Sequence, residues 1–465
     1  MHVKKCKTLF LLACLALCLI PLVGMIIRPT TESTENRVLS PFPAIKTETG
    51  ALNLDFFKKF EIWFQEHFAF RNELVSADAY IQGSVFGTSS TKSVIYGQEG
   101  WLYYTSTLKD FLGTDRMTSR ELYNLAHNLG IVCRYVEGRG CKVLLAVPPN
   151  KNTLYGQYMP YYDSLIADSS HDMDRMKSVL EKERVPYVDL AELFRKEDEI
   201  LYLKRDSHWN NKGAVMVYNI IMDSLGYSHE NYGDCAVSIV HDEDGDLNRM
   251  LYSFYGKRED NYAYVVPQEY HYVTDTKSVE DSWIETENPV AQGKLLMFRD
   301  SFGNTLLPLF ANQFERACFS KEGLYWVEKH MDECSPDAVV MEKVERNLSD
   351  FIIKPPLLTS PKENLPQNTE IKETDTTLNL NKCDFNIDYC EISGEVDKTI
   401  VQEKSDIIVQ VNQVCYNAYH TGENGFLVYM KKENMPVFPL DIRVFVKNGQ
   451  DVSEVQRGIW NEAVW

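Results

Sequence analysis

Two short blocks of the chain together contain the three side chains that nucleophilic acyl transfer requires. Arg205–Trp209 (RDSHW) includes Asp206 and His208, and Phe298–Gly303 (FRDSFG) includes Ser301. A serine nucleophile needs a base to take its proton, and that base needs a carboxylate to set its tautomer. Asp206 and His208 are two residues apart, so in an extended segment their side chains leave the same face. We therefore expect an Asp–His–Ser triad in which Ser301 arrives from another part of the fold.

Strands and helices alternate through the middle of the chain, which predicts an α/β fold around a parallel sheet. The expected strands are Lys142–Val147, Val185–Leu190, Lys294–Phe298 and Ala338–Met341. The expected helices are Glu121–Glu137, Asp172–Lys182, Asn211–Leu225 and Asn304–Arg316. Ser301 would follow the third strand, at the edge where open α/β sheets bind ligands and where a helix N-terminus can hold an oxyanion. The alternative is that Ser301 is an ordinary helix cap.

Three further segments have recognisable patterns. Apolar residues recur at helical spacing from Phe56 to Asp78, which predicts an amphipathic helical stretch that packs onto the domain, with a membrane-surface role as the alternative. Ser93–Tyr104 is typical of a β-hairpin. The long, acidic, Tyr-rich stretch 232–291 lies between the two blocks. We expect it to form a lid or substrate wall, or an elaborated edge of the sheet.

The N-terminal residues predict a membrane anchor. Thr8–Ile27 has no charged residue, and a run of about twenty apolar residues is the length that crosses a bilayer as a helix. Lys4, Lys5 and Lys7 precede it, which predicts a cytoplasmic N-terminus and an exported body. A cleaved secretory signal is the alternative, but no small-residue cleavage site follows the apolar run. We therefore expect a single-pass protein of the cell membrane with an extracytoplasmic body.

Composition excludes several classes of function. The net charge of −19 argues against nucleic acid and against an anionic membrane surface as partners. A content of 44% apolar residues is typical of a folded chain. We find no phosphate-binding loop, dinucleotide fingerprint or zinc spacing, so we expect no cofactor and no metal. The alternating Asp242, Asp244 and Asp246 lack the Gly and distal Glu of a calcium loop, which favours an exposed acidic turn.

Cysteine spacing leaves the disulfides open. An exported body permits them, and Cys383–Cys390 and Cys133–Cys141 are candidate pairs because their members are close in sequence. The alternative is that most of these cysteines are small buried residues.

The predicted organisation has five parts. They are the cytoplasmic tip and anchor 1–29, a tether 30–50, an α/β domain 51–354, a Pro- and Thr-rich linker 355–376 and a small β-sandwich 377–465. The strands expected in the last part are Thr399–Gln402, Asp406–Val411, Gly425–Met430 and Leu440–Val446. This part is expected to be Ig-like or similar to a carbohydrate-binding module.

Several motifs in a fixed order resemble the alginate O-acetyltransferase family of the AlgX and AlgJ type, and especially its DHHW-type relatives from Gram-positive bacteria. The motifs are NRVLSPFP, FQEHFAFRNEL, VIYGQEGWLYY, VPPNKNTLY, RDSHWNNKGA, FRDSFGN and MEKVERNL. They span Asn36–Leu348. The resemblance implies an SGNH-hydrolase-like three-layer sandwich with a circularly rearranged motif order, in which the serine block follows the Asp–His block.

The resemblance also implies roles for individual residues. Ser301 would be the nucleophile, His208 the general base and then the general acid, and Asp206 the residue that orients His208. Sites of this type complete the oxyanion hole with an Asn or Gly N–H, for which Asn152 is the candidate.

Three more residues are candidates for substrate binding. Arg299 would bind an anionic glycan or form an ion pair with Asp300 or another acid. Trp209 would stack on a sugar ring or anchor its own loop. Lys151 would be a ligand or a solvated loop charge.

The resemblance implies a membrane-anchored, extracytoplasmic O-acyltransferase that acetylates hydroxyls of a cell-surface polysaccharide. It further implies a membrane-bound acyltransferase as the partner that supplies acetyl groups. Two alternatives stay open at this point. One is a carbohydrate esterase that uses the same triad with water, and the other is a non-catalytic glycan-binding or assembly protein.

Overall fold

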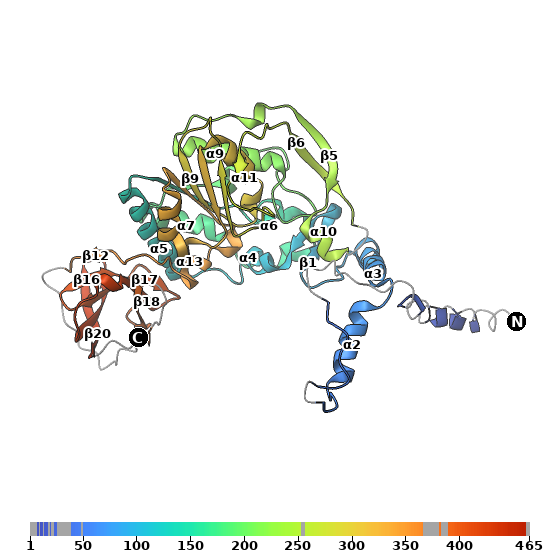
Figure 1. Ribbon diagram of the computed structural model, residues 1–465, viewed down its shortest axis with the longest axis horizontal. Helices are drawn as coiled ribbons and strands as arrows, with labels where there is room; N and C mark the ends of the chain where they lie inside the picture. Colours follow the sequence, from blue (N-terminus) through green and yellow to red (C-terminus); the bar gives the residue numbers. More distant parts are fainter. Residues whose placement is uncertain are drawn as a thin grey trace.

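The computed structural model describes residues 39–47, 50–252, 256–365, 381–382 and 389–461, together with part of residues 7–25. This part of the chain contains a seven-stranded sheet flanked by helices and two antiparallel sheets near the C-terminus (Figure 1). Much of the predicted anchor Thr8–Ile27 lies outside the described residues. None of the helices that are described combines the length and the apolar character that crossing a membrane requires.

The central sheet has the strand order β4-β3-β11-β9-β10-β8-β7. Its strands are β3 (Lys142–Ala146), β4 (Tyr187–Val188), β7 (His271–Tyr272), β8 (Trp283–Glu287), β9 (Lys294–Phe298), β10 (Arg316–Ser320) and β11 (Ala338–Glu342). The first five in this order run parallel, and β8 and β7 continue the sheet antiparallel. The predicted α/β class is confirmed, although the expected strand Val185–Leu190 shrinks to two residues and β10 was not foreseen.

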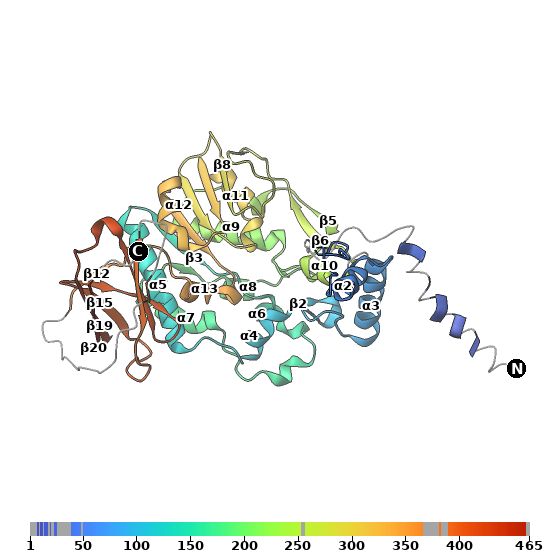
Figure 2. The same ribbon diagram turned by 60° about the horizontal axis from the view of Figure 1, so that its bottom comes forward.

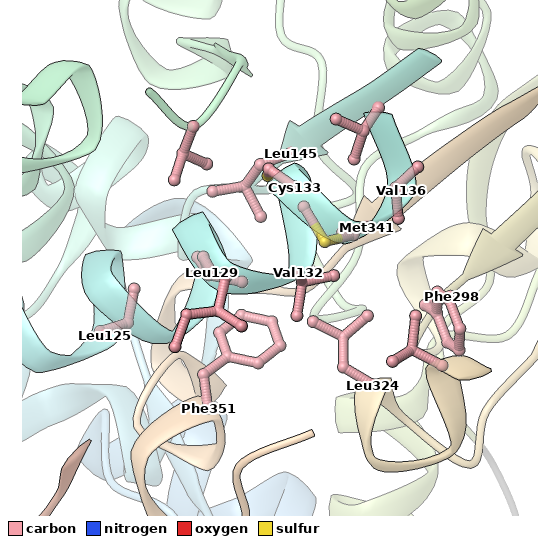
Figure 3. Close-up of a cluster of buried hydrophobic side chains, with 14 of the residues drawn as sticks. Leu125, Leu129, Val132, Cys133, Val136, Leu145, Phe298, Leu324, Met341 and Phe351 are labelled. Atoms are coloured by element: carbon pink, nitrogen blue, oxygen red, sulfur yellow. The ribbon is translucent and has the colours of Figure 1, made fainter. Parts of the chain in front are cut away.

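Helices cover both faces of this sheet because successive strand residues point to opposite sides. One face packs on α5 (Ser119–Gly138), α7 (Asp172–Lys182), α12 (Val327–Cys334) and α13 (Asp350–Ile353). The other face packs on α8 (Leu190–Arg195), α9 (Asn211–Leu225) and α11 (Leu307–Gln313). In β3, for example, Leu145 enters the first core and Leu144 the second. Figure 3 shows the first core, where Leu129 and Val132 of α5 approach Phe351.

The segment before the sheet contains two helices where one helical stretch was predicted. They are α2 (Phe56–His67) and α3 (Arg71–Phe86). The break occurs at Phe70, whose φ of 61° is left-handed and cannot continue a helix. The predicted hairpin is confirmed as β1 (Val94–Tyr96) paired with β2 (Leu102–Tyr104).

Of the two expectations for residues 232–291, the elaborated edge of the sheet is confirmed. Its last portion supplies β7 and β8 at the edge of the central sheet. Its first portion forms a separate hairpin of β5 (Val237–Glu243) and β6 (Glu259–Tyr264), with α10 (Asp246–Leu251) between the two strands. This α10 returns to the loop that carries Asp206.

The C-terminal strands form two antiparallel sheets that share one apolar core. One sheet contains β12 (Lys362–Glu363), β15 (Asp406–Val411), β16 (Val414–Asn417), β19 (Leu440–Asn448) and β20 (Asp451–Trp460). The other contains β13 (Asn381–Lys382), β14 (Tyr389–Glu395), β17 (Tyr419–Thr421) and β18 (Gly425–Lys431). Two expectations are wrong: Thr399–Gln402 is not a strand, and β12 lies inside the predicted linker. Figure 2 shows these sheets beside α5, at the end of the molecule away from α3.

The disulfide differs from the predicted pairs. Cys318 of β10 is bonded to Cys334 of α12, so the bridge ties the central sheet to a covering helix. Cys133 and Cys141 are free thiols, so that predicted pair is wrong. Cys383 of the other candidate pair lies outside the described residues.

A buried asparagine joins the C-terminal sheets to the helices of the central sheet. Asn128 of α5 donates its amide hydrogens to the carbonyls of Phe351, at 3.0 Å, and His420, at 2.9 Å. Its amide oxygen accepts the N–H of His420 at 2.9 Å. All three bonds are buried, so each has to be replaced if Asn128 is lost.

We predict that Asn128→Ala lowers the free energy of unfolding by about 1–3 kcal/mol, because buried backbone groups of Phe351 and His420 lose their partner. Urea denaturation followed by fluorescence measures this change. Asn434→Ala, at an exposed position, is the control and should unfold as the unaltered protein does. Equal stability of both variants would contradict the prediction.

Candidate active site

The structure brings the three predicted residues of the triad together. His208 Nδ1 lies 2.6 Å from Asp206 Oδ1, and His208 Nε2 lies 2.8 Å from Ser301 Oγ. Ser301 comes three residues after the end of β9 and leads into a short helical turn at Phe302–Asn304. Asp206 and His208 lie in the loop before α9, where Tyr202 and Trp209 form an isolated β-bridge. The arrangement is a continuous hydrogen-bonded chain from carboxylate to hydroxyl.

Electrostatics favour an ionised Asp206 beside His208. Burial alone would raise the pKa of Asp206, but hydrogen bonds and charge from His208 and the N–H of Asp246 hold that pKa well below its ordinary value. Burial alone would lower the pKa of His208, but its hydrogen bond with Asp206 and the negative charge there raise it overall. His208 is therefore a stronger base than a free imidazole.

Asp246 is a member of this site that the sequence analysis missed. Its N–H donates to Asp206 Oδ2 at 2.7 Å, and its carboxylate accepts the N–H and the hydroxyl of Ser207 at 2.7 and 2.6 Å. Asp246 is the first residue of α10, whereas we expected it to lie in an exposed acidic turn. Its carboxylate lies 3.9 Å from His208 Nδ1.

Gly245 allows α10 to approach the Asp206 loop closely. A Cβ atom on Gly245 would lie 2.3 Å from the carbonyl oxygen of Arg205 and 2.8 Å from the amide nitrogen of Asp206. Only a residue without a side chain permits this contact. The Gly-Asp dipeptide at 245–246 is the sequence signal that could have indicated a close backbone contact.

Lys151 is buried rather than solvated. Its ammonium group donates to the carbonyls of Leu203, Lys204 and Asp206, the last at 2.6 Å. It also lies 5.3 Å from the ring centre of Tyr103. Burial lowers the pKa of Lys151 to about 8. Lys151 therefore holds the backbone of the Asp206 loop, and the structure supports neither a ligand role nor a solvated charge.

For Trp209 the structure supports the loop-anchoring alternative, and Arg299 is held by protein contacts although it also borders the cavity next to Ser301. Trp209 is 1% exposed and donates its indole N–H to Thr305 Oγ1 at 2.7 Å, so it anchors its loop and presents no face to a sugar. Arg299 is also buried, and its guanidinium donates to Asn304 Oδ1 and to the carbonyl of Val279. Its expected ion pair with Asp300 is absent among the ion pairs of the described residues.

The structure also argues against the oxyanion role of the Asn152 side chain. Its amide nitrogen donates to the carbonyl and the hydroxyl of Thr107, at 3.1 and 2.9 Å. Both of its donors are used in holding α6 (Lys151–Tyr155) against the segment before α4 (Leu108–Leu112).

A pair of acids shapes the turn that carries Ser301. Asp300 accepts the N–H groups of Phe302 and Val344, both at 2.9 Å, and its own N–H donates to Glu342 Oε2 at 2.9 Å. Burial, followed by the charge of Asp300, raises the pKa of Glu342 well above its ordinary value. This shift favours the neutral form of Glu342 and so reduces repulsion between the two carboxyl groups.

Phe302 fills the space behind the imidazole. It is fully buried, and its ring centre lies 4.6 Å from that of His208 and 4.9 Å from that of Trp209. The guanidinium of Arg346 lies 5.6 Å from the same ring. These contacts limit the rotation of His208 away from Ser301.

Ser301 opens onto a cavity of about 510 Å³. Three lysines line it: Lys321 is paired with Glu280 at 2.5 Å, Lys343 is paired with Asp350 at 2.6 Å, and Lys354 lies 4.0 Å from the ring centre of Tyr325. The apolar part of the lining includes Leu324, Tyr325 and Phe351. The cavity thus has apolar surface and charged groups of both signs next to the hydroxyl, since Glu322 and Asp350 also line it.

Two groups of described residues have the composition of a metal site. Asp206, His208 and Asp246 bring their ligand atoms within 4.8 Å of one another, and so do Asp110, His171 and Glu345. In the first group both nitrogens of His208 are already engaged, by Asp206 and by Ser301. The geometry of that group therefore suits proton transfer better than metal binding.

We predict that His208 titrates above the ordinary histidine pKa of about 6.5, because the ionised Asp206 stabilises its imidazolium. In Asp206→Asn the pKa should fall, since the amide carries no charge. The measurement is an NMR titration of the imidazole signals, with His208→Gln to identify the resonance. An unchanged pKa in Asp206→Asn would show that the two groups are not coupled.

We also predict that Gly245→Ala lowers the free energy of unfolding by about 1–3 kcal/mol, because the new methyl group overlaps the backbone of Arg205. The same variant should shift the His208 titration, since α10 can no longer donate to Asp206 at its present distance. Gly138→Ala is the matched control, because a Cβ there meets nothing within 4 Å. If both glycine variants behave alike, α10 does not support this loop as described.

Comparison with known proteins gives one family match. Residues 94–291 match the model of the family described as the SGNH hydrolase-like domain of the acetyltransferase AlgX. Asp206 and His208 lie within the matched residues, and Ser301 lies after them. No curated protein matches the sequence.

Several solved structures resemble the chain distantly. PatB1 of Bacillus cereus is 17% identical with a TM-score of 0.44, and the match covers 55% of this chain and 96% of PatB1. A DHHW family protein of Eubacterium siraeum is 16% identical with a TM-score of 0.41, covering 55% and 95%. AlgX of Pseudomonas aeruginosa is 13% identical with a TM-score of 0.36, covering 80% and 92%. The family match confirms the resemblance inferred from the motifs, in that residues 94–291 are similar to an AlgX-type SGNH hydrolase-like acetyltransferase domain.

Proposed function

We propose that this protein is an O-acyltransferase that transfers an acyl group, most simply acetyl, to hydroxyls of a cell-surface polysaccharide. The observation that carries the proposal is the hydrogen-bonded chain Asp206–His208–Ser301, with contacts of 2.6 and 2.8 Å. This chain ends at a hydroxyl that faces a cavity. The AlgX-type family match supports acyl transfer as the chemistry, and the identity of the acceptor follows from the resemblance alone.

In the first half-reaction Ser301 Oγ attacks the carbonyl carbon of the acyl donor while its proton passes to His208 Nε2. Asp206 stabilises the imidazolium that forms. The tetrahedral intermediate then collapses, the bond to the donor's leaving group breaks, and His208 returns the proton to that leaving group. The product is an acyl ester on Ser301.

The oxyanion needs donors that are not already bonded. The N–H groups of Asp300 and Phe302 donate to Glu342 and Asp300, respectively. The N–H of Ser301 itself is one candidate in this turn. Hydrogen bonds to a developing oxyanion are worth about 3–4 kcal/mol of barrier each, so such a donor would contribute substantially to the rate.

In the second half-reaction an acceptor hydroxyl gives its proton to His208 Nε2 and attacks the Ser301 ester. Collapse restores the Ser301 hydroxyl with the proton from His208, and the acceptor leaves as an ester. Water in place of the acceptor would give hydrolysis. The cavity beside Ser301, with Tyr325 and Lys354 in its lining, is where the acceptor would bind.

The setting of the reaction is part of the proposal. The apolar run Thr8–Ile27 would anchor the protein in the cell membrane with the catalytic part outside. A membrane-bound acyltransferase would supply the acetyl groups, as the resemblance implies. The C-terminal pair of sheets would hold the glycan, in the manner of a carbohydrate-binding domain.

The test is to incubate the full chain with p-nitrophenyl acetate and follow both p-nitrophenol release and intact mass. We predict that Ser301→Ala lowers turnover by at least about 10³-fold and abolishes any acetyl adduct, because the nucleophile is lost. Ser224→Ala, which alters an exposed hydroxyl on α9, is the matched control and should keep full turnover.

Addition of soluble oligosaccharides then distinguishes the outcomes. Acetylated oligosaccharide that depends on Ser301 supports transfer, and release of acetate alone supports an esterase. If a folded preparation gives neither turnover nor adduct, or if Ser301→Ala retains both, acyl transfer through Ser301 is refuted.

A further inference from the structure

The helix α2 exposes an unusual amount of apolar surface. Among its twelve residues are four phenylalanines, an isoleucine and a tryptophan, yet its only buried residue is Glu66. Phe57 is 81% exposed, and Leu54 in the loop before the helix is 95% exposed. Isolated helices of about 12 residues are marginal in water and depend on packing of their apolar side. The surface of α2 therefore needs a covering that the described chain does not supply.

The tether covers only part of this surface. The ring of Phe42 contacts those of Phe60 and Trp63, with ring centres 6.0 and 4.8 Å apart. The N–H of Ser40 donates to Glu66 at 2.6 Å. Phe57 is on the part of the helix that these contacts leave exposed.

The C-terminal end of α2 lies next to the end of the predicted anchor. Gly24 is buried, and a Cβ atom on it would lie 2.6 Å from Cβ of Ala69 and 2.9 Å from Cε2 of Phe70, in the turn between α2 and α3. The apolar run ends at Ile27, three residues later. In Figure 1, α2 points downward from the body, whereas the described N-terminal residues extend to the right of the body. The two directions therefore cross. A helix placed in this way next to a membrane span would lie along the membrane surface.

The composition of this arm, residues 42–47 and 50–67, suits the boundary between lipid and water. Aromatic residues favour that boundary, and Lys58 and Lys59 can reach the headgroups beside Phe57. Exposed apolar patches on soluble surfaces mark interaction sites, and here the neighbouring body with the matching chemistry is the bilayer. The net charge of −19 is spread over the whole chain, so it does not prevent this local contact.

We infer that residues 42–47 and 50–67 form an arm that lies on the outer surface of the phospholipid bilayer, with Leu54 and Phe57 inserted among the acyl chains. The inference rests on the proposed membrane anchor. It adds a second contact that orients the catalytic part. Ala79 of α3 packs in one cluster with Leu247 and Leu251 of α10, the helix that donates to Asp206. Contact with the membrane would therefore set the orientation of the triad relative to the bilayer.

The test uses the full chain reconstituted in phosphatidylcholine vesicles, with and without lipids brominated on their acyl chains, which quench tryptophan on contact. Phe57→Trp places a probe on the arm, and Val437→Trp, at an 88% exposed position in the loop between β18 and β19, is the matched control. We expect brominated lipid to reduce the emission added by F57W by about twofold or more, since interfacial side chains lie about 5–10 Å deep. The emission added by V437W should not change.

Flotation of the same vesicles separates this inference from the anchor on which it rests. If the protein floats with the vesicles but F57W is not quenched, the anchor stands and the membrane contact of the arm is refuted. A blue shift of F57W that depends on protein concentration without quenching would show that a second copy covers the arm, and this also refutes the inference. If the protein does not float with the vesicles, both the membrane anchor and the membrane contact of the arm are refuted.

Discussion

The buried carboxylate of Asp206 is the group on which the arrangement of the site depends. An ionised group that is removed from water needs donors and opposite charge, or it takes up a proton. Asp206 receives the imidazole and the backbone N–H of His208, and the N–H of Asp246. The backbone carbonyl of Asp206 accepts a hydrogen bond from the ammonium group of Lys151. Donors from α6, α10 and the loop before α9 therefore meet at one residue, and the position of His208 follows from theirs.

Ser301 is held from the other side of the site by Asp300 and Glu342. Asp300 accepts two backbone N–H groups, and burial together with the charge of Asp300 raises the pKa of Glu342. The central sheet supplies the rigid base for this turn, because β9 and β11 are neighbouring parallel strands that end at the same edge. The Ser301 hydroxyl and the His208 imidazole come together because the loop after β9 and the loop before α9, each stabilised by its own hydrogen bonds, lie next to each other at that edge.

Much of the secondary structure follows from local patterns. The predicted bounds of α7, α9, β9 and β15 agree with the structure, because continuous apolar runs and 3.6-residue periodicity are properties of a few neighbouring residues. Predictions fail where distant contacts decide. β4 is short because it pairs with β3 over only two residues, and β12 exists because β16 offers it an edge. The break between α2 and α3 involves a left-handed backbone conformation at Phe70, and the residue type of a phenylalanine does not predict such a conformation.

The sequence by itself determined the chemical types of the site and their order: a carboxylate and an imidazole two residues apart, and a hydroxyl just after a buried strand. These are local relations, so spacing and periodicity suffice to find them. Only the tertiary structure decided what the neighbouring polar residues do. Lys151 and Trp209 proved to be buried supports, and Asp246, forty residues from Asp206, proved to be a partner of the triad. Burial and hydrogen-bond partners arise from contacts between segments far apart in the chain, and one sequence read residue by residue does not contain those distances.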